Sequence, residues 1–315
     1  MIMANEGYGK VILFNEHFVV YGIPAIASAV DRSTTAKVEA CMTSCGGEFI
    51  PGVYLEDQRP ETPGYKESKI DQQRDSIRYM LEAMDIDPTT NPIKVTLGGE
   101  LMCASGIGAS AASCTAMARA LSDFYDLGLD DDRINEIAYE GERGYHGIPS
   151  GIDNTAATFG GLIWFRKEPP TLDRMNLPQQ VEIVMGNTGK VADTTAAVAG
   201  VGERRERFPE KYAKLFEEAS EMAATAREAL DAGDLERVGK LMDDNHRLLQ
   251  QIEVSSVELD LLVDVARRNG ALGAKMTGGG LGGNMVALTP GKELQERVAK
   301  AIEAEGFSAL RTRIG

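Results

Sequence analysis

Four side chains of the kinds that phosphoryl transfer needs lie near predicted loop corners: Lys10, Ser110, Glu142 and Asp153. The reaction calls for a cation near the transferred group, oxygen ligands for Mg²⁺, and a carboxylate beside the attacking hydroxyl. Each carboxylate also has a purely structural explanation. Asp153 could cap a helix, and Glu142 could pair with Arg143 or Arg133 on a helix surface. Their chemistry therefore depends on whether the surrounding elements place them around bound phosphates.

A glycine-rich segment, residues 103–112, provides one candidate phosphate site. It follows a predicted strand, 93–97, and precedes a predicted helix, 111–125. Gly106 and Gly108 can take positive φ, and the free N–H groups of a first helical turn favour an anion. No Gly-Lys-Ser/Thr follows, so the segment is not a Walker A motif. A tight strand-to-helix turn without a ligand explains these residues about equally well.

A second glycine-rich segment, residues 275–284, has five glycines in the six positions 278–283. Packing alone does not require so many, so we expect the backbone to approach a ligand closely here. A third unusual feature is the run Asn15-Glu16-His17 between apolar segments. It fits either a solvent-exposed corner or polar groups held at a ligand, and the residues by themselves slightly favour the corner.

The composition excludes several classes of function. The formal net charge of −15 repels nucleic acid and anionic membranes, so neither is expected as a partner. The four cysteines form no Cys-x-x-Cys, which predicts reduced thiols and a cytoplasmic protein. Only three histidines are present, which argues against a metal site built from several histidines. No signal peptide or membrane-spanning run is recognisable.

The hydrophobic periodicity predicts a mixed α and β chain, with a proline-rich linker at 167–180. Residues 44–69 are expected to form an irregular excursion or a hairpin. The predicted strands are 10–14, 18–21, 25–30, 34–43, 93–97, 160–166, 181–185, 285–288 and 307–311. The predicted helices are 71–84, 111–125, 133–143, 154–158, 193–200, 209–230, a segment ending at 252, 257–268 and 293–305.

Three segments resemble, in the same order, the three motifs of the GHMP kinase superfamily. The first is Gly9-Lys10-Val11-Ile12-Leu13-Phe14 followed by Glu16-His17 and Val19-Val20-Tyr21-Gly22; the second and third are 106–112 and 275–283. Residues 141–154 resemble its mevalonate kinase branch in particular. The resemblance covers nearly the whole chain and is weakest over 44–69.

The resemblance implies an α+β fold of two domains. An N-terminal α/β domain like domain 2 of ribosomal protein S5 would span 1–178, and a ferredoxin-like C-terminal domain would span 179–315. The family places its active site in the cleft between these domains. Family members often form dimers, so a homodimer is possible.

The resemblance also implies phosphorylation of mevalonate to 5-phosphomevalonate by ATP and Mg²⁺, a step toward isoprenoid precursors. Asp153 would be the catalytic base, Lys10 would stabilise charge, and Ser110 and Glu142 would hold Mg²⁺. The nucleotide phosphates would contact Gly106, Ile107, Gly108, Ala109, Ser110, Gly278, Gly279 and Gly280. The substrate would lie near Glu16, His17, Ser150, Gly151 and Thr195.

The chain departs from the family motifs at several positions. Asn15 and Leu281 stand where glycine is usual, Tyr8 replaces a proline, and Asn284 replaces a common cysteine; Cys103, Ala109 and Gly279 are further differences. These changes keep open a kinase of the same superfamily for another small hydroxy acid or polyol. A non-catalytic ligand sensor on this fold is a second alternative.

A dehydrogenase is the remaining alternative. Gly106-x-Gly108-x-x-Ala111 superficially fits a dinucleotide-binding fingerprint. However, two helices and no evident strand follow the segment, which leaves no place for the acidic residue that would bind the ribose.

Overall fold

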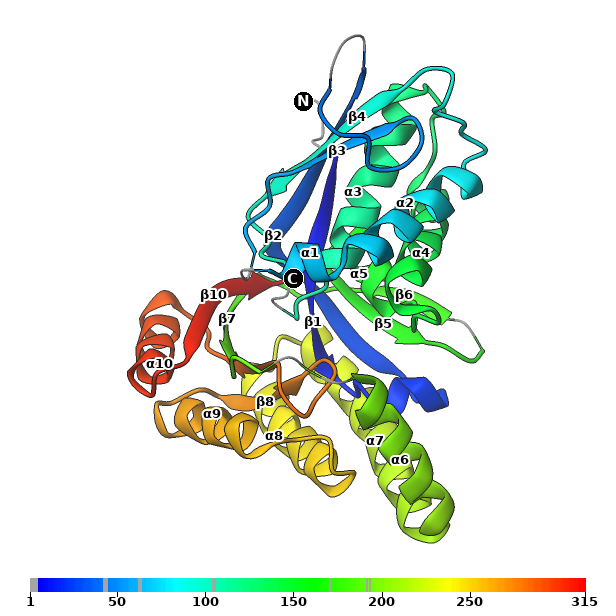
Figure 1. The fold of residues 1–315 in the computed structure, drawn as a ribbon. Coiled ribbons are helices and arrows are strands. Elements are labelled where there is room, and N and C mark those ends of the chain that lie inside the picture. The colour runs from blue at the N-terminus through cyan, green and yellow to red at the C-terminus, as the bar shows by residue number, and fades with distance from the viewer. Residues whose placement is uncertain are drawn as a thin grey trace. The chain divides into compact units, whose positions relative to one another are not determined.

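The computed structural model describes residues 5–41, 45–61, 64–103, 106–169, 171–190, 192 and 194–315 (Figure 1). The chain divides into two compact units. Unit 1 comprises Met1–Lys10 and Arg32–Gly160, and unit 2 comprises Val11–Asp31 and Gly161–Gly315. Strands β1 (Glu6–Phe14) and β2 (Ala25–Ala40) each run from one unit into the other. The family domain boundary at residue 178 stays a prediction, because these units are defined by compactness.

Unit 1 has a sheet covered by helices. Strand β4 (Ile93–Gly99) pairs in parallel with β3 (Val53–Asp57) and antiparallel with the second half of β2. Alternate residues of β4 are buried, and they pack in one core with apolar residues of the helices. The helices of the unit are α1 (Tyr65–Ser68), α2 (Ile70–Ala83), α3 (Ala109–Phe124), α4 (Asp131–His146) and α5 (Ile152–Phe159).

Unit 2 contains an antiparallel sheet in the order β2 (first half), β10, β7, β9, β8; β5 pairs with β2 and β6 pairs with β5. Its strands are β5 (Leu162–Arg166), β6 (Thr171–Met175), β7 (Val181–Asn187), β8 (Gly273–Thr277), β9 (Asn284–Leu288) and β10 (Ser308–Ile314). Its helices are α6 (Thr194–Arg207), α7 (Pro209–Asp231), α8 (Leu235–Gln251), α9 (Val257–Arg268) and α10 (Lys292–Ala304). Helices α8 and α9 pack on β8, and α10 packs on β7 and β10 (Figure 1).

Several predictions of secondary structure are wrong. Residues 44–69, predicted to be irregular or a hairpin, contain strand β3, which pairs in parallel with β4, and helix α1. Residues 18–21 form a 3₁₀ helix, η1 (Phe18–Tyr21), which ends at a left-handed Gly22. The two predicted strands at 25–30 and 34–43 are one continuous strand, β2. Part of the predicted linker forms β6, because its residues pair with β5 in register. In the last two cases, pairing with neighbouring strands determined the structure more strongly than local sequence propensity did.

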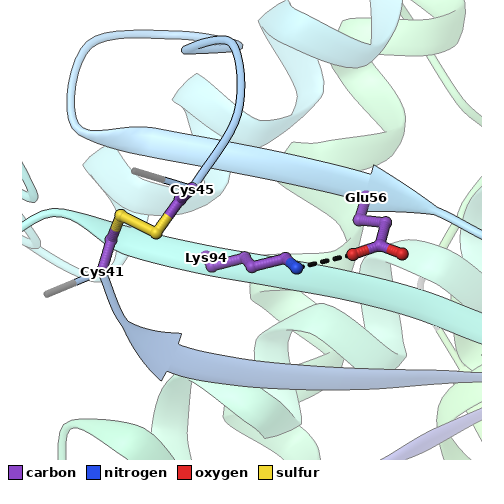
Figure 2. Close-up of a disulfide and its surroundings, with 4 residues drawn as sticks. All are labelled: Cys41, Cys45, Glu56 and Lys94. Atoms are coloured by element: carbon purple, nitrogen blue, oxygen red, sulfur yellow. Dashed lines mark ion pairs between the residues drawn. A yellow bond between two sulfur atoms is a disulfide. The ribbon is translucent and has the colours of Figure 1, made fainter. Parts of the chain in front are cut away.

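The prediction of four reduced thiols is also wrong. Cys103 and Cys114 are free and buried, but Cys41 and Cys45 form a disulfide at the end of β2. Figure 2 shows this bond beside an ion pair between Lys94 and Glu56 on neighbouring strands. The Cα atoms of the two cysteines are 6.1 Å apart, within the range that a disulfide can bridge.

In the ranges described above, no helix is both long and apolar enough to cross a bilayer.

Candidate active site

Asp153 and Lys10 form an ion pair within unit 1. The Nζ atom of Lys10, on β1, lies 3.1 Å from Oδ1 of Asp153 in the first turn of α5. The lysine side chain is 7% exposed and the aspartate side chain is 32% exposed. Gly151 occupies the N-cap position of α5, so the alternative explanation of Asp153 as a helix cap is wrong. The carboxylate is therefore held by a buried cation and remains accessible.

The first glycine-rich segment does end in a helix N-terminus. Gly106 and Gly108 have φ of 71° and 75°, and α3 begins directly afterwards, at Ala109. Ser110 thus lies in the first helical turn, because the helix begins two residues before the predicted start at residue 111. The backbone N–H of Lys10 donates to the carbonyl of Ile107 (2.8 Å), which ties the lysine to the glycine segment. Ala104 and Ser105, also in this segment, lie outside the described residues.

We predict that Gly108→Ala lowers turnover by up to about 100-fold, because an added Cβ would lie 2.9 Å from Cγ of Lys10. Displacing a reacting group by about 1 Å can lower the rate of an enzyme by about 100-fold. The control is Gly128→Ala, which has a similar positive φ of 59° but no atom within 4 Å of the added Cβ. Steady-state kinetics of both variants separate displacement of Lys10 from backbone strain. Equal activity losses would contradict this role for Gly108.

Glu142 is buried rather than on the surface, so its predicted alternative as a partner of Arg143 is wrong. Its side chain is 2% exposed, and Arg143 pairs instead with Glu140 at 2.6 Å. Burial raises the pKa of Glu142 to about 8, and the nearby charge of Asp153 adds to this effect. A hydrogen bond from Ser110 and the charge of Lys10 act in the opposite direction. Four predicted site residues are thus brought together in unit 1.

The surroundings of Glu142 suit a magnesium ion. Its Oε1 atom is buried without a hydrogen-bond partner in the described part of the chain, and the hydroxyl of Ser110 contacts the same carboxylate. The described residues contain no group of three or more His, Cys, Asp or Glu that could hold a metal by themselves. Mg²⁺ commonly takes one or two carboxylates and completes its shell with water and phosphate oxygens. Glu142 and Ser110 therefore fit such a site.

Two neighbours of this cluster were missed by the sequence analysis. Nε2 of His146 lies 3.5 Å from Oγ of Ser110 and 3.8 Å from Oε2 of Glu142. Its position four residues after Glu142 on α4 was a usable signal. Arg59 is buried, pairs with Asp57 through two hydrogen bonds, and donates to the carbonyl of Ala109 (3.2 Å). Arg59 lies in the segment predicted to be irregular, where no local pattern marked it.

In unit 2, the run Asn15-Glu16-His17 is not a solvent-exposed corner, because all three residues are buried. Asn15 has a φ of 70°, which explains how it can replace the usual glycine, since asparagine tolerates this conformation. Leu281, also in place of a glycine, has a φ of 57° and is 40% exposed. An asparagine side chain can form a local hydrogen bond in this conformation, but a leucine side chain cannot. The backbone of Leu281 is therefore strained.

Glu16 forms a fully buried ion pair with Lys275, at the start of the second glycine-rich segment. Nζ of Lys275 also donates to the carbonyl of Met276 (2.7 Å). Burial lowers the pKa of Lys275, whereas the charge of Glu16 opposes that change. The pair joins parts of the chain that are 259 residues apart.

We predict that Lys275→Met lowers the free energy of unfolding by about 3–5 kcal/mol, because Glu16 loses its buried cation. Urea unfolding measures the loss. The double variant Glu16→Gln, Lys275→Met should recover a large part of it, and Lys292→Met, at an exposed lysine, should have little effect. A stable single variant would show that the pair contributes little.

His17 is held as a neutral imidazole. Its Nε2 lies 3.1 Å from the carbonyl oxygen of Gly279, so this nitrogen must carry the proton and donate it. Nδ1 is then an acceptor, and it is buried without a hydrogen-bond partner among the described residues. Burial lowers the pKa of His17 to about 4. His17 therefore has one buried acceptor whose hydrogen bond is not made within the described residues.

The remaining predicted site residues lie on both units. Ser150 and Gly151 precede α5 in unit 1, and the Ser150 hydroxyl accepts from the N–H of Ile152 (3.4 Å). Thr195 is exposed in the first turn of α6 in unit 2. Gly278, Gly279 and Gly280 directly follow β8.

Comparison with known proteins gives a consistent result over nearly the whole chain. Residues 74–161 match the GHMP kinases N terminal domain, and residues 226–308 match the GHMP kinases C terminal model. Mevalonate kinases of Thermococcus gammatolerans and Pyrococcus furiosus are 36% and 35% identical; each alignment covers 97% of this chain and 94% of the relative. The crystal structure of L. major mevalonate kinase in complex with R-mevalonate is similar with a TM-score of 0.93 and 39% identity, covering 100% of this chain and 96% of that one.

Proposed function

Because the chain belongs to the GHMP kinase family, we propose that it is an ATP-dependent kinase that phosphorylates the 5-hydroxyl of mevalonate. The products are 5-phosphomevalonate and ADP. The observation that carries this proposal is the Lys10–Asp153 pair, 3.1 Å apart beside a glycine segment and a helix N-terminus. Relatives at 34–36% identity, all named mevalonate kinase, support the substrate.

Asp153 acts as the general base in this proposal. Its carboxylate accepts the proton of the 5-hydroxyl as the oxygen attacks the γ-phosphorus of ATP. Lys10 keeps the carboxylate oriented and offsets negative charge that develops on the transferred group. The free N–H groups at the start of α3 would bind a phosphate of the nucleotide.

Ser110 and Glu142 would hold the magnesium ion. When bound, Mg²⁺ neutralises charge on the nucleotide phosphates. Glu142 must be ionised to serve as a ligand, and the ion itself would favour that form over the protonated form that burial favours. His146 lies close enough to both residues to keep their oxygens oriented.

His17 would recognise the substrate. Its buried Nδ1 acceptor suits a hydroxyl group, and Gly279 fixes the ring through the other nitrogen. Glu16, Ser150, Gly151 and Thr195 are the other proposed substrate contacts.

A panel of acceptors tests the substrate assignment. The protein is incubated with ATP, Mg²⁺ and one of mevalonate, homoserine, galactose or phosphomevalonate, and ADP release is followed. We expect turnover with mevalonate at least about 100-fold above the other acceptors. Turnover with another acceptor alone would favour the alternative of a related kinase, with Asn15 and Leu281 as the first residues to examine. ATP binding without any turnover would favour the non-catalytic sensor.

The same proposal includes a cytoplasmic location and, as a possibility implied by family resemblance, a homodimer. The acidic net charge of −15 supports the absence of nucleic acid and anionic membrane partners.

A further inference from the structure

The edge of strand β8 is covered by side chains instead of by another strand. Among the described strands, β8 pairs only with β9. On its other edge, the N–H of Ala274 donates to Oδ1 of Asp243 on α8 (2.8 Å), and Nη2 of Arg267 on α9 donates to the carbonyl of Ala274 (2.8 Å). Nε of Arg267 also donates to Asp243 (2.7 Å), so the two side chains support each other. Open strand edges are usually protected, and helices α8 and α9 serve that purpose here.

His246 covers the next outward-facing residue of the strand. The N–H of Met276 donates to Nδ1 of His246 (3.3 Å). The imidazole must therefore be neutral, with its proton on Nε2. It lies three residues after Asp243 on α8, and so on the same face of the helix. The residue is only 1% exposed, which means that this contact is made without competition from solvent.

His246 lines a cavity of about 340 Å³, and its Nε2 atom is buried. Oδ1 of Asp260 lies 3.2 Å away, but without the geometry of a hydrogen bond. That oxygen instead accepts a hydrogen bond from the hydroxyl of Ser255 (2.6 Å). Gln250 and Leu261 also line the cavity. The ring is thus anchored on its strand side and forms part of the cavity wall.

Met276 lies at the start of the second glycine-rich segment, two residues before its first glycine. Only Thr277 separates it from Gly278, where the five glycines begin. Such a segment has many accessible conformations, and fixing them on ligand binding costs conformational entropy. Anchoring its entry in advance lowers that cost. Further along, the N–H of Leu281 donates to the carbonyl of Val254, just after α8 (2.8 Å).

We propose that His246 is a positioning residue for nucleotide binding, because its Nδ1 atom anchors Met276 and thereby pre-orders the glycine segment 278–283. It contacts no reacting group and acts through the backbone of β8. The inference rests on the proposed function, in which this segment lies beside the ATP phosphates.

The test measures the Kd of a non-hydrolysable ATP analogue with Mg²⁺ by calorimetry. His246→Leu removes the acceptor at similar size, and His246→Asn retains an acceptor oxygen near the position of Nδ1. We expect the Leu variant to weaken binding by about 2- to 12-fold, the factor that one net hydrogen bond contributes. The Asn variant should bind nearly as the wild type does. Gln250→Leu, on the same helix and cavity wall, is the matched control and should leave the Kd unchanged.

Chemical rescue separates positioning from a general loss of packing. In His246→Ala the vacated space joins the cavity, so free imidazole can enter and accept from Met276 again. Millimolar imidazole should restore the nucleotide Kd of the Ala variant, whereas pyrrole, which lacks an acceptor nitrogen, should not. Imidazole should have no effect on the nucleotide Kd of the Leu variant or of the wild type. This arm also remains informative if the Leu variant does not fold.

Two outcomes would overturn the proposal. The first is a nucleotide Kd that is unchanged in the folded Leu and Ala variants. The second is weakened binding in the Ala variant that imidazole does not restore, together with equally weakened binding in the Asn variant. Because the readout is nucleotide binding, it is independent of the acceptor. If the wild type binds the analogue but phosphorylates no mevalonate, the proposed function fails while the role of His246 is still tested.

Discussion

Asp153→Asn is expected to lower kcat by at least about 100- to 10,000-fold, the range that a positioned general base contributes. The amide keeps the shape of the carboxylate but cannot accept the substrate proton. It also removes the negative charge that lies 3.1 Å from Nζ of Lys10. The dissociation constant for the nucleotide should change much less, since Asp153 acts on the acceptor hydroxyl. Single-turnover kinetics and calorimetry measure the two quantities separately.

Asp132→Asn is the matched control, because Asp132 is an exposed carboxylate in the same unit, at the start of α4. It should keep wild-type kcat. If Asp153→Asn retained more than about a tenth of the wild-type kcat, Asp153 could not be the base, and the Lys10–Asp153 pair would be structural.

Glu142→Gln should have opposite effects on activity and stability. Loss of a magnesium ligand should lower the affinity for Mg²⁺ by at least about 10- to 100-fold, a loss seen even for residues that only support a ligand. In the metal-free protein, however, the same change removes a carboxylate that is costly to ionise where it is buried. The pKa of Glu142 is raised to about 8 by that burial. The variant should therefore be less active but more stable.

The stability effect should depend on pH in a defined direction. Between the unfolded pKa of 4.5 and the folded value of about 8, the folded state binds more protons than the unfolded state, so stability falls as pH rises. In EDTA, Glu142→Gln should thus raise Tm at pH 8, by about 2–4 °C for each kcal/mol gained in the free energy of unfolding. Near pH 4.5 the substitution should change Tm little. Melting curves at both pH values test this. An equal Tm for variant and wild type at pH 8 would show that ionisation of Glu142 does not destabilise the folded protein.

The residues of unit 1 could be predicted largely because their motifs are local. The helix start after Gly108 follows from turn chemistry, and the N-terminus of α4 is capped by Asp130, which accepts from the N–H of Arg133 (2.9 Å). The burial of Glu142 was missed although the pattern contained it. The buried face of α4 includes Ile134, Ile137, Ala138 and Gly141, and Glu142 continues that helical spacing.

Contacts between distant parts of the chain could not be predicted in the same way. No local pattern connects Glu16 with Lys275, or His246 with Met276, because these pairs form only when strands and helices pack. The glycine pattern at 106–111 also left a dehydrogenase open, and membership of the GHMP kinase family now shows that alternative to be wrong. A short pattern of this kind specifies a turn before a helix, and the surrounding side chains specify its chemistry.

The most direct test of the central claim identifies the product. The protein is incubated with ATP, Mg²⁺ and R-mevalonate, and the product is examined by phosphorus–proton correlated NMR. We predict a phosphate coupled to the protons of carbon 5 with the wild type, and no such product with Asp153→Asn over the same time. Mevalonate that remains unmodified while the wild type binds ATP, or a phosphate attached to another oxygen, would contradict the account.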